Sequence, residues 1–326
     1  MDIGFVVLTL ASIIASSSPV VLASIGETIS EKSGVINLSL DGSIALSAMA
    51  GFAVACTTNH VLLGVLTAMA VGALVALIIA FASITLRQEQ VAIGFVLTML
   101  CTDLADFLGR PFVRVPGPSV PHLPIPYLSG IPALGSIFFN HDVLVYLSLL
   151  VIIAAWWWIE RTQPGLKMRG VGERPEAAFA RGVHVNLTRY LYVVVGGALV
   201  GLGGAAYSLS VKLGWSYRHT FGIGWIALAI VIFGGWSPWR VAAGSYLFGL
   251  LRALGSILQR NPAFAVLPTQ IFSSAPFALM IFALLLLNNE GIDRLLALLP
   301  PSLAWRIDQV LRGRAPAGLG KPFIQD

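Results

Sequence analysis

Two acidic residues, Asp103 and Asp106, have the type and spacing that could do chemistry inside an apolar segment. A separation of three residues places both carboxylates on one face of a helix. Ionisable side chains within membrane-type segments are candidates for function, and Asp103 is the only fair candidate here for a site that couples to an ion. The pair also lies near the end of its segment, where water would solvate both groups, and the sequence favours neither interpretation.

The other reactive residues argue against an enzyme. Cys56 and Cys101 stand alone in apolar runs, so we expect them to pack as small core residues rather than form a redox pair. The sequence contains no His/Glu cluster, no G-x-S-x-G and no G-x-x-x-x-G-K-[ST]. We therefore predict a chain that binds no metal or cofactor and does not itself hydrolyse ATP.

Polar and aromatic side chains gather at two Gly-containing interruptions of the apolar sequence, Gly26–Gly42 and Lys212–Gly224. Asn and Ser can hydrogen-bond a polar solute, and aromatic rings can stack on a flat one. For Trp215 and Tyr217, anchoring at a membrane surface is at least as good an interpretation. The predicted solute-path residues are Asn37, Ser39, Asp41, Ser43, Ser47, Trp215, Tyr217, His219, Trp225 and Asp103.

A third polar stretch, Pro164–Arg189, is rich in Arg yet carries an apolar patch at residues 177–180. Pro175 suits the first position of a helix, and Gly182 suits the left-handed residue that follows one. The spacing predicts a two-turn helix over Pro175–Arg181. A helix this short is marginal alone in water, so an exposed Phe179 favours docking into a groove of another protein. The alternative is that Phe179 packs on the inner ends of the chain's own membrane helices.

The composition defines the elements that must position these residues. Hydrophobic residues make up 57% of the chain and charged residues 11%, and the mean hydropathy is +0.85. Gly42–Leu86 contains no Asp, Glu, Lys or Arg, and one membrane crossing needs about 20 residues. The sequence predicts an all-α polytopic membrane protein. The net charge of +5 comes from loop arginines and does not indicate nucleic-acid binding.

About eight to ten membrane helices are expected, and two of the apolar segments are short. Ile44–Cys56 has 13 residues and Trp225–Trp236 has 12, and each follows a full span and a polar break. Paired broken segments indicate an inverted repeat with the solute path between its halves. The alternative is two ordinary loops flanked by longer helices. The nine predicted segments are Phe5–Ile25, Ile44–Cys56, Val61–Leu86, Val91–Leu108, Val143–Ile159, Leu191–Val211, Trp225–Trp236, Val241–Leu258 and Leu267–Leu287.

The distribution of basic residues predicts the orientation. Placing residues 160–190 in the cytoplasm puts 14 Lys and Arg residues inside and six outside, as the positive-inside rule favours. The N-terminus is then outside and the C-terminus is cytoplasmic. Within a membrane domain of residues 1–290, the Pro-rich residues 109–140 form an extended extracytoplasmic cap. Residues 291–326 form an amphipathic cytoplasmic tail with short helices on the lipid surface.

Two stretches resemble one known family. The string GVGERPEAAFARGVHVNLTRY, from Gly170, resembles the coupling-helix loop in permease subunits of bacterial ABC importers for simple sugars, branched-chain amino acids and nucleosides. Arg174 stands where the family usually has Asn. The matching residues are Arg169, Gly172, Pro175, Ala177, Ala178, Gly182, Val183 and Val185.

The second stretch, GETISEKSGVINLSLDG, is similar to the signature G-E-x-x-x-E-R-S-G-V-x-N-L-G-L-E-G of the nucleoside-type branch. Lys32, Ser39 and Asp41 depart from it, and Ser39 replaces a glycine close to the expected path. The resemblance implies import of a nucleoside, with a simple sugar as the alternative. An ion-coupled secondary transporter, with Asp103 as its coupling site, is a weaker hypothesis that the resemblance does not support.

The resemblance also implies partners. They are a separate ABC-type ATPase that holds ATP and Mg²⁺, a second permease subunit that is expected to be a different chain, and an extracytoplasmic substrate-binding protein. The expected location is the bacterial cytoplasmic (inner) membrane. The residues implied to contact the ATPase are Glu173, Arg174, Pro175, Glu176, Ala177, Ala178, Phe179, Arg181 and Gly182.

Overall fold

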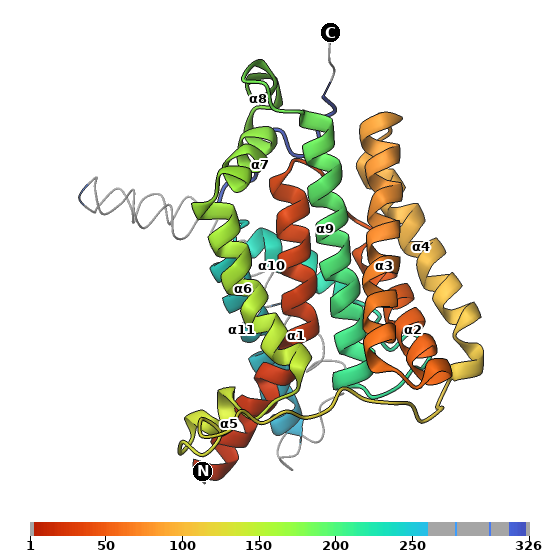
Figure 1. Cartoon of the computed structure of the whole chain (residues 1–326), viewed down its shortest axis with the longest axis vertical. Coiled ribbons are helices and arrows are strands. Elements are labelled where there is room, and N and C mark those ends of the chain that lie inside the picture. Colours follow the sequence, from red (N-terminus) through yellow and green to blue (C-terminus); the bar gives the residue numbers. More distant parts are fainter. Residues whose placement is uncertain (1–2, 260–277, 279–299, 301–312, 324–326) are drawn as a thin grey trace.

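A computed structural model of the chain describes residues 3–259, 278, 300 and 313–323 (Figure 1). Its described residues contain seven helices long and apolar enough to cross a membrane, and no strand, so the predicted polytopic all-α class is confirmed. These helices are α1 Ile3–Lys32, α2 Leu40–Thr58, α3 Val61–Ala80, α4 Gln90–Leu108, α6 Val143–Arg161, α9 Val185–Ala206 and α11 Pro238–Gln259. The predicted ninth segment and the predicted tail helices at residues 292–310 lie outside the described residues, apart from residues 278 and 300.

The first interruption is shorter than its sequence suggests. Helix α1 continues through GETISEK to Lys32, and α2 has 19 residues instead of the predicted 13, so the prediction of a short segment here is wrong. This polar stretch is helical because it is buried within the bundle, where the side chains of Glu27, Thr28 and Glu31 find hydrogen-bond partners. We call the remaining non-helical residues, 33–39, the first break; Gly34 within it has φ +98°.

The second interruption ends two residues earlier than predicted, because the helix that follows it begins at Ile223. Helix α9 continues into a π-helical turn, η3 (Tyr207–Val211), and the chain then runs through residues 212–222, which we call the second break. The following helix, α10 (Ile223–Phe233), has 11 residues and matches the predicted short segment.

Helices α2 and α10 begin at one point and run to opposite sides of the molecule. The Asp41 carboxylate, in the first turn of α2, accepts hydrogen bonds from the backbone N–H groups of Gly222 (3.2 Å) and Gly224 (2.9 Å) at the start of α10. Near the other end of α10, the Trp236 indole donates to Glu31 in the last turn of α1. Helix α2 instead runs away from that end of α1, towards the start of α3 (Figure 1). The order of long helix, break and second helix thus occurs twice, with opposite directions after the breaks.

Helix α9 lies between α1 and α3 (Figure 1). Glycines allow this close packing: a side chain at Gly72 or Gly197 would collide with the facing backbone of α9 or α3. Small residues at helix contacts are typical of membrane bundles. Large apolar side chains on the outer faces of α3, α4 and α6, including Leu62, Leu74 and Met99, are exposed, as expected for a surface that faces lipid.

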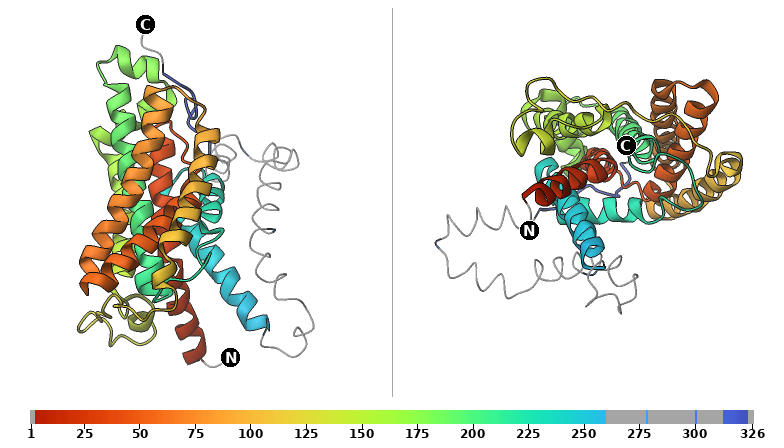
Figure 2. Two further views of the ribbon diagram at one scale, coloured as in Figure 1. Left: turned by 90° about the vertical axis from the view of Figure 1, so that its right-hand side faces the viewer. Right: turned by 90° about the horizontal axis from the view of Figure 1, so that it is seen from below.

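The connections at the two ends of the bundle differ. Residues 109–142 are mostly irregular, with a 3₁₀ turn (η2, Arg110–Phe112) and a five-residue helix, α5 (Leu134–Phe138). At the other end lie α7 (Gln163–Glu173), α8 (Pro175–Ala180) and the last described residues, 313–323 (Figure 1). Figure 2 shows that α11 and the N-terminal part of α1 lie at the end opposite α8.

Candidate coupling and solute sites

The loop between α6 and α9 holds two helices where the sequence predicted one. Thr162 caps α7, accepting from the Gly165 N–H at 3.1 Å, and Pro164 occupies its first turn. The sequence analysis missed α7 because its Pro and three Gly residues disfavour helix. Packing overrides that preference: Gly172 lies directly against the Lys32 carbonyl at the end of α1. The Thr-x-Pro start was the signal that could have found it.

Helix α8 forms where predicted. Pro175 opens it, Arg181 follows it, and Gly182 adopts φ +80°. The Gly182 N–H donates to the Phe179 carbonyl at 2.8 Å and the Val183 N–H donates to the Ala178 carbonyl at 3.1 Å, which satisfies the end of the helix. Pro175 and Ala178 are buried. The remaining predicted contact residues are exposed and form one surface, namely Glu173, Arg174, Glu176, Ala177, Phe179, Arg181 and Gly182.

Phe179 packs against its own chain in a way that neither sequence interpretation named. Its ring lies 5.7 Å, centroid to centroid, from that of Phe323, which is buried. The Gly318 N–H donates to the Gly172 carbonyl at 2.8 Å, and the Ala317 N–H donates to the Glu173 carboxylate at 3.2 Å. The C-terminal segment, residues 313–323, therefore lies on α7 and α8, and 41% of the Phe179 side-chain surface stays exposed.

The same C-terminal segment reaches the first break. The Gly320 N–H donates to the Gly34 carbonyl at 3.1 Å, and the buried Arg189 guanidinium donates to the Lys321 carbonyl at 3.0 Å. Lys32, at the end of α1, is 3.8 Å from Glu160, which is 3.3 Å from Arg169 on α7. The loop with α8 is thus connected to the first break by direct contacts.

The predicted solute-path residues of the first break form a buried hydrogen-bonded network. Glu27 accepts from the Asn37 N–H at 2.9 Å, and Asn37 accepts from the Ser39 N–H at 3.1 Å and the Ser39 hydroxyl at 2.7 Å. The Ser39 and Ser43 hydroxyls are 2.9 Å apart. Ser47 is buried further along α2. These groups hold the break together; that they also contact solute stays a prediction.

Of the predicted residues in and after the second break, the structure brings Trp215 and His219 together, with ring centroids 4.6 Å apart, and leaves Tyr217 and Trp225 apart from them. Trp215 is buried, Tyr217 is exposed, and Trp225 lies 5.5 Å from the Phe95 ring. His219 is partly buried, its ring contacting the Ser216 carbonyl at 2.6 Å and its own carbonyl accepting from the Tyr207 hydroxyl at 2.7 Å. Burial lowers the pKa of His219 below its ordinary value and so favours the neutral ring.

The two acids of α4 have separate environments. Asp103 is exposed, whereas Asp106 is buried and lies 3.8 Å from the Arg218 guanidinium in the second break. The Arg218 N–H also points at Asp106, at 3.5 Å. Asp106 thus joins α4 to the second break, and the two carboxylates do not act as one pair.

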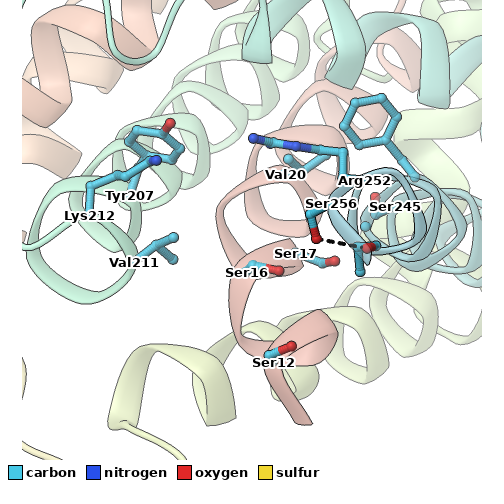
Figure 3. Close-up of a pocket in the computed structure, with 13 residues that line it drawn as sticks. Ser12, Ser16, Ser17, Val20, Tyr207, Val211, Lys212, Ser245, Arg252 and Ser256 are labelled. Atoms are coloured by element: carbon cyan, nitrogen blue, oxygen red, sulfur yellow. Dashed lines mark hydrogen bonds between the residues drawn. The ribbon is translucent and has the colours of Figure 1, made fainter. Parts of the chain in front are cut away.

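A polar cavity of about 290 Å³, which we call the serine cavity, lies between α1, η3 and α11 (Figure 3). Its floor is buried and includes Ser17, Tyr207, Ser245 and Phe248; its rim is exposed. None of the described residues that line it is acidic. The rim residues with polar side chains are Ser12, Ser16, Lys212, Arg252 and Ser256.

The sequence analysis did not predict the serine cavity. Its signal was a polar stripe at helical spacing, Ser12 and Ser16 on α1 and Ser245, Arg252 and Ser256 on α11, within otherwise apolar helices. None of the predicted solute-path residues lines it. The described residues hold no group of three or more His, Cys, Asp or Glu side chains that could bind a metal.

Comparisons with known proteins agree with this arrangement. The family model described as "Branched-chain amino acid transport system / permease component" matches residues 9–284. A putative glucose ABC transporter permease protein of Haloferax volcanii is 39% identical, over 74% of this chain and 74% of its own length. A guanosine ABC transporter permease protein of Bacillus subtilis is 34% identical, over 82% of this chain and 88% of its own length. A nucleoside ABC transporter permease protein of Lactococcus lactis is 32% identical, over 86% of this chain and 92% of its own length. No solved structure matches.

The helices, the α7–α8 loop and these matches define a multi-pass membrane permease. The chain belongs to the permease-component family of branched-chain amino acid transport systems.

Proposed function

We propose that the chain is the membrane-spanning permease subunit of an ATP-driven ABC importer and forms half of the path for a nucleoside. The observation that carries the proposal is the surface of α8, with exposed charged side chains around a half-exposed Phe179 at one end of the bundle. Its connection to the first break gives a force on α8 a direct route into the membrane domain.

The proposal includes three partners. An ATPase subunit that binds ATP and Mg²⁺ docks on Glu173, Arg174 and the α8 surface. A second permease chain completes the path, and an extracytoplasmic binding protein delivers the solute. The α8 end faces the cytoplasm of the cytoplasmic (inner) membrane, with the N-terminus outside, because this orientation keeps most Lys and Arg residues inside.

The solute assignment rests on relatives and on the signature at residues 26–42. Two of the relatives are named for a nucleoside and for guanosine. A simple sugar is the second candidate, because a relative named for glucose shares 39% of aligned residues. Uptake of labelled guanosine and glucose by cells that express the complete importer separates the two.

Substitutions in α8 test the docking claim. Phe179→Asp and Ala178→Asp each place a charge on or beneath the docking surface, and we expect loss of co-purification with the ATPase while membrane insertion is retained. Phe138→Asp is the matched control, since Phe138 has a similar exposure of 40% on α5 at the opposite end. Unchanged ATPase association in both α8 variants, or uptake that persists without any ATPase and follows an ion gradient, contradicts the proposal.

A further inference from the structure

We propose that the serine cavity is a binding site for the imported solute and that it selects an oxopurine nucleoside over an aminopurine nucleoside or a sugar. This inference rests on the proposed function and adds the place of recognition and the residue that sets the preference, Arg252. A cavity of about 290 Å³ lies just below the usual range for ligand pockets, about 300–1,000 Å³.

The cationic side of the cavity requires acceptors from the ligand. Lys212 and Arg252 carry only hydrogen-bond donors, and none of the described lining residues is acidic. Figure 3 shows the Arg252 side chain extending from α11 across the cavity towards Tyr207. Its guanidinium lies 6.0 Å from the Phe248 ring centroid, which supports it from the cavity floor. An arginine held this way fits two adjacent acceptors on one planar ligand.

An oxopurine carries that pair of acceptors on one edge. Its O6 and N7 accept together from an arginine, whereas adenine presents an amino donor beside N7 and repels it. The Tyr207 hydroxyl already donates to the His219 carbonyl at 2.7 Å, so Tyr207 offers the cavity its ring rather than its donor. Sugars lack a planar edge with two neighbouring acceptors.

The serine side of the cavity has the opposite character. Four hydroxyls donate to carbonyls of their own helices, so each turns lone pairs to the cavity and accepts from the ligand. Ser17 Oγ has no partner in the described part of the chain although the residue is buried, and Gly249 on α11 leaves the space that it occupies. Because the Ser17 oxygen is enclosed, the acceptors open to the ribose of a nucleoside are the exposed hydroxyls of Ser12, Ser16 and Ser256. The four back-bonded serines are Ser12, Ser16, Ser245 and Ser256.

Competition for uptake tests the preference. In cells that lack other nucleoside uptake and express the complete importer, we expect guanosine and inosine to compete with labelled guanosine at least about tenfold better than adenosine does. Arg252→Gln is expected to remove that preference and lower guanosine uptake by about tenfold or more. Arg252→Lys keeps the charge but loses the two-pronged geometry, so the preference also falls. The matched control is Arg110→Gln, because Arg110 also lies over an aromatic ring, that of Phe107, but outside the cavity. This variant is expected to retain the preference for guanosine over adenosine.

A second variant keeps the inference testable should both Arg252 variants fail to insert. Replacing both Ser16 and Ser256 with Ala removes two acceptors from the rim and is expected to leave thermal stability unchanged, because each exposed hydroxyl bonds only a carbonyl of its own helix. Guanosine uptake is expected to fall severalfold. Wild-type preference in Arg252→Gln, or unchanged guanosine uptake in the Ser16→Ala, Ser256→Ala double variant, overturns the inference while nucleoside import stands. If the wild-type importer takes up glucose and no nucleoside, the nucleoside assignment itself is wrong. Co-purification with the ATPase then still tests whether the chain is a permease subunit of an ABC importer.

Discussion

The two breaks in this bundle lead to helices α2 and α10, whose first turns meet at the Asp41 carboxylate, yet the breaks are held in different ways. The first break is buried: the side chains of Glu27, Asn37 and Ser39 bond its backbone and one another. Gln90 of α4 accepts from the Ile36 N–H at 2.8 Å, which ties the break to a further helix. Few of these groups can move without leaving a buried donor unpaired.

The second break is more exposed and more strained. Leu213 and Arg218 have positive φ values of 52° and 49°, which side chains other than Gly adopt only at a cost. Tyr217 and Phe221 are exposed. Its backbone contacts the Pro-rich loop, with the Arg114 N–H donating to the Trp215 carbonyl at 3.2 Å. A π-helical turn, η3, precedes it, and such turns are frequent at functional sites.

The difference indicates a division of labour. The first break is joined to α7, α8 and the C-terminal segment and is stiff enough to pass on a displacement. The second break adjoins the serine cavity through η3 and Lys212 and has the freedom to change shape. Asp41 connects the two, because its carboxylate stabilises the N-terminal ends of both α2 and α10.

The largest effect is expected where the two breaks meet. Asp41→Ala leaves the N–H groups of Gly222 and Gly224 unpaired, and we expect a loss of about 3 kcal/mol in the free energy of unfolding, at about 1–3 kcal/mol per orphaned group. Denaturant unfolding in detergent micelles measures it. Asp41→Asn retains a hydrogen-bond acceptor, so its free energy of unfolding is expected to fall by less than that of Asp41→Ala. Equal stability of the alanine variant and the wild type would mean that Asp41 does not join the breaks.

A smaller effect is expected within the first break alone. Asn37→Ala removes the acceptor of both Ser39 bonds, and we expect a loss of about 2 kcal/mol by the same unfolding measurement. Ser256→Ala serves as a control, since this exposed hydroxyl bonds only the carbonyl of Ala253 in its own helix. If Asn37→Ala changes the free energy of unfolding by less than about 0.5 kcal/mol, these hydrogen bonds do not make the first break rigid.

How far the sequence predicts this contrast depends on where the decisive partners lie. Helix α8 was predictable because Pro175 and Gly182 mark its ends locally. The true extent of α2 was not, since the polar Asp41 and Ser43 look like a loop until their partners, 181 residues away for Gly222, are known. The serine cavity and the contact of Phe323 with Phe179 likewise join distant residues, and periodicity in one segment carries no information about them.

The C-terminal segment is expected to matter for coupling more than for stability. Phe323→Ala removes a buried ring that packs against Phe179 of α8 at the edge of the bundle. We expect the free energy of unfolding to fall by about 1–2 kcal/mol, which is well below the loss for Phe→Ala in a protein core. ATP-driven uptake should fall severalfold, because the links from α7 to Gly34 through residues 318–321 loosen. Limited tryptic proteolysis after Arg314, which is exposed in the same segment, should accelerate in parallel. Normal uptake with faster proteolysis would show that the segment is not part of the coupling route.

The smallest effect is expected at the ion pair of the second break. Arg218→Gln removes a side chain that is 66% exposed and 3.8 Å from Asp106. Exposed pairs contribute about 0–1 kcal/mol, so we expect a change within about 0.5 kcal/mol that shrinks further at high salt. The Arg218 N–H still reaches Asp106, which limits the loss. A loss above about 2 kcal/mol would show that the second break is held as firmly as the first, and the division of labour between them would no longer stand.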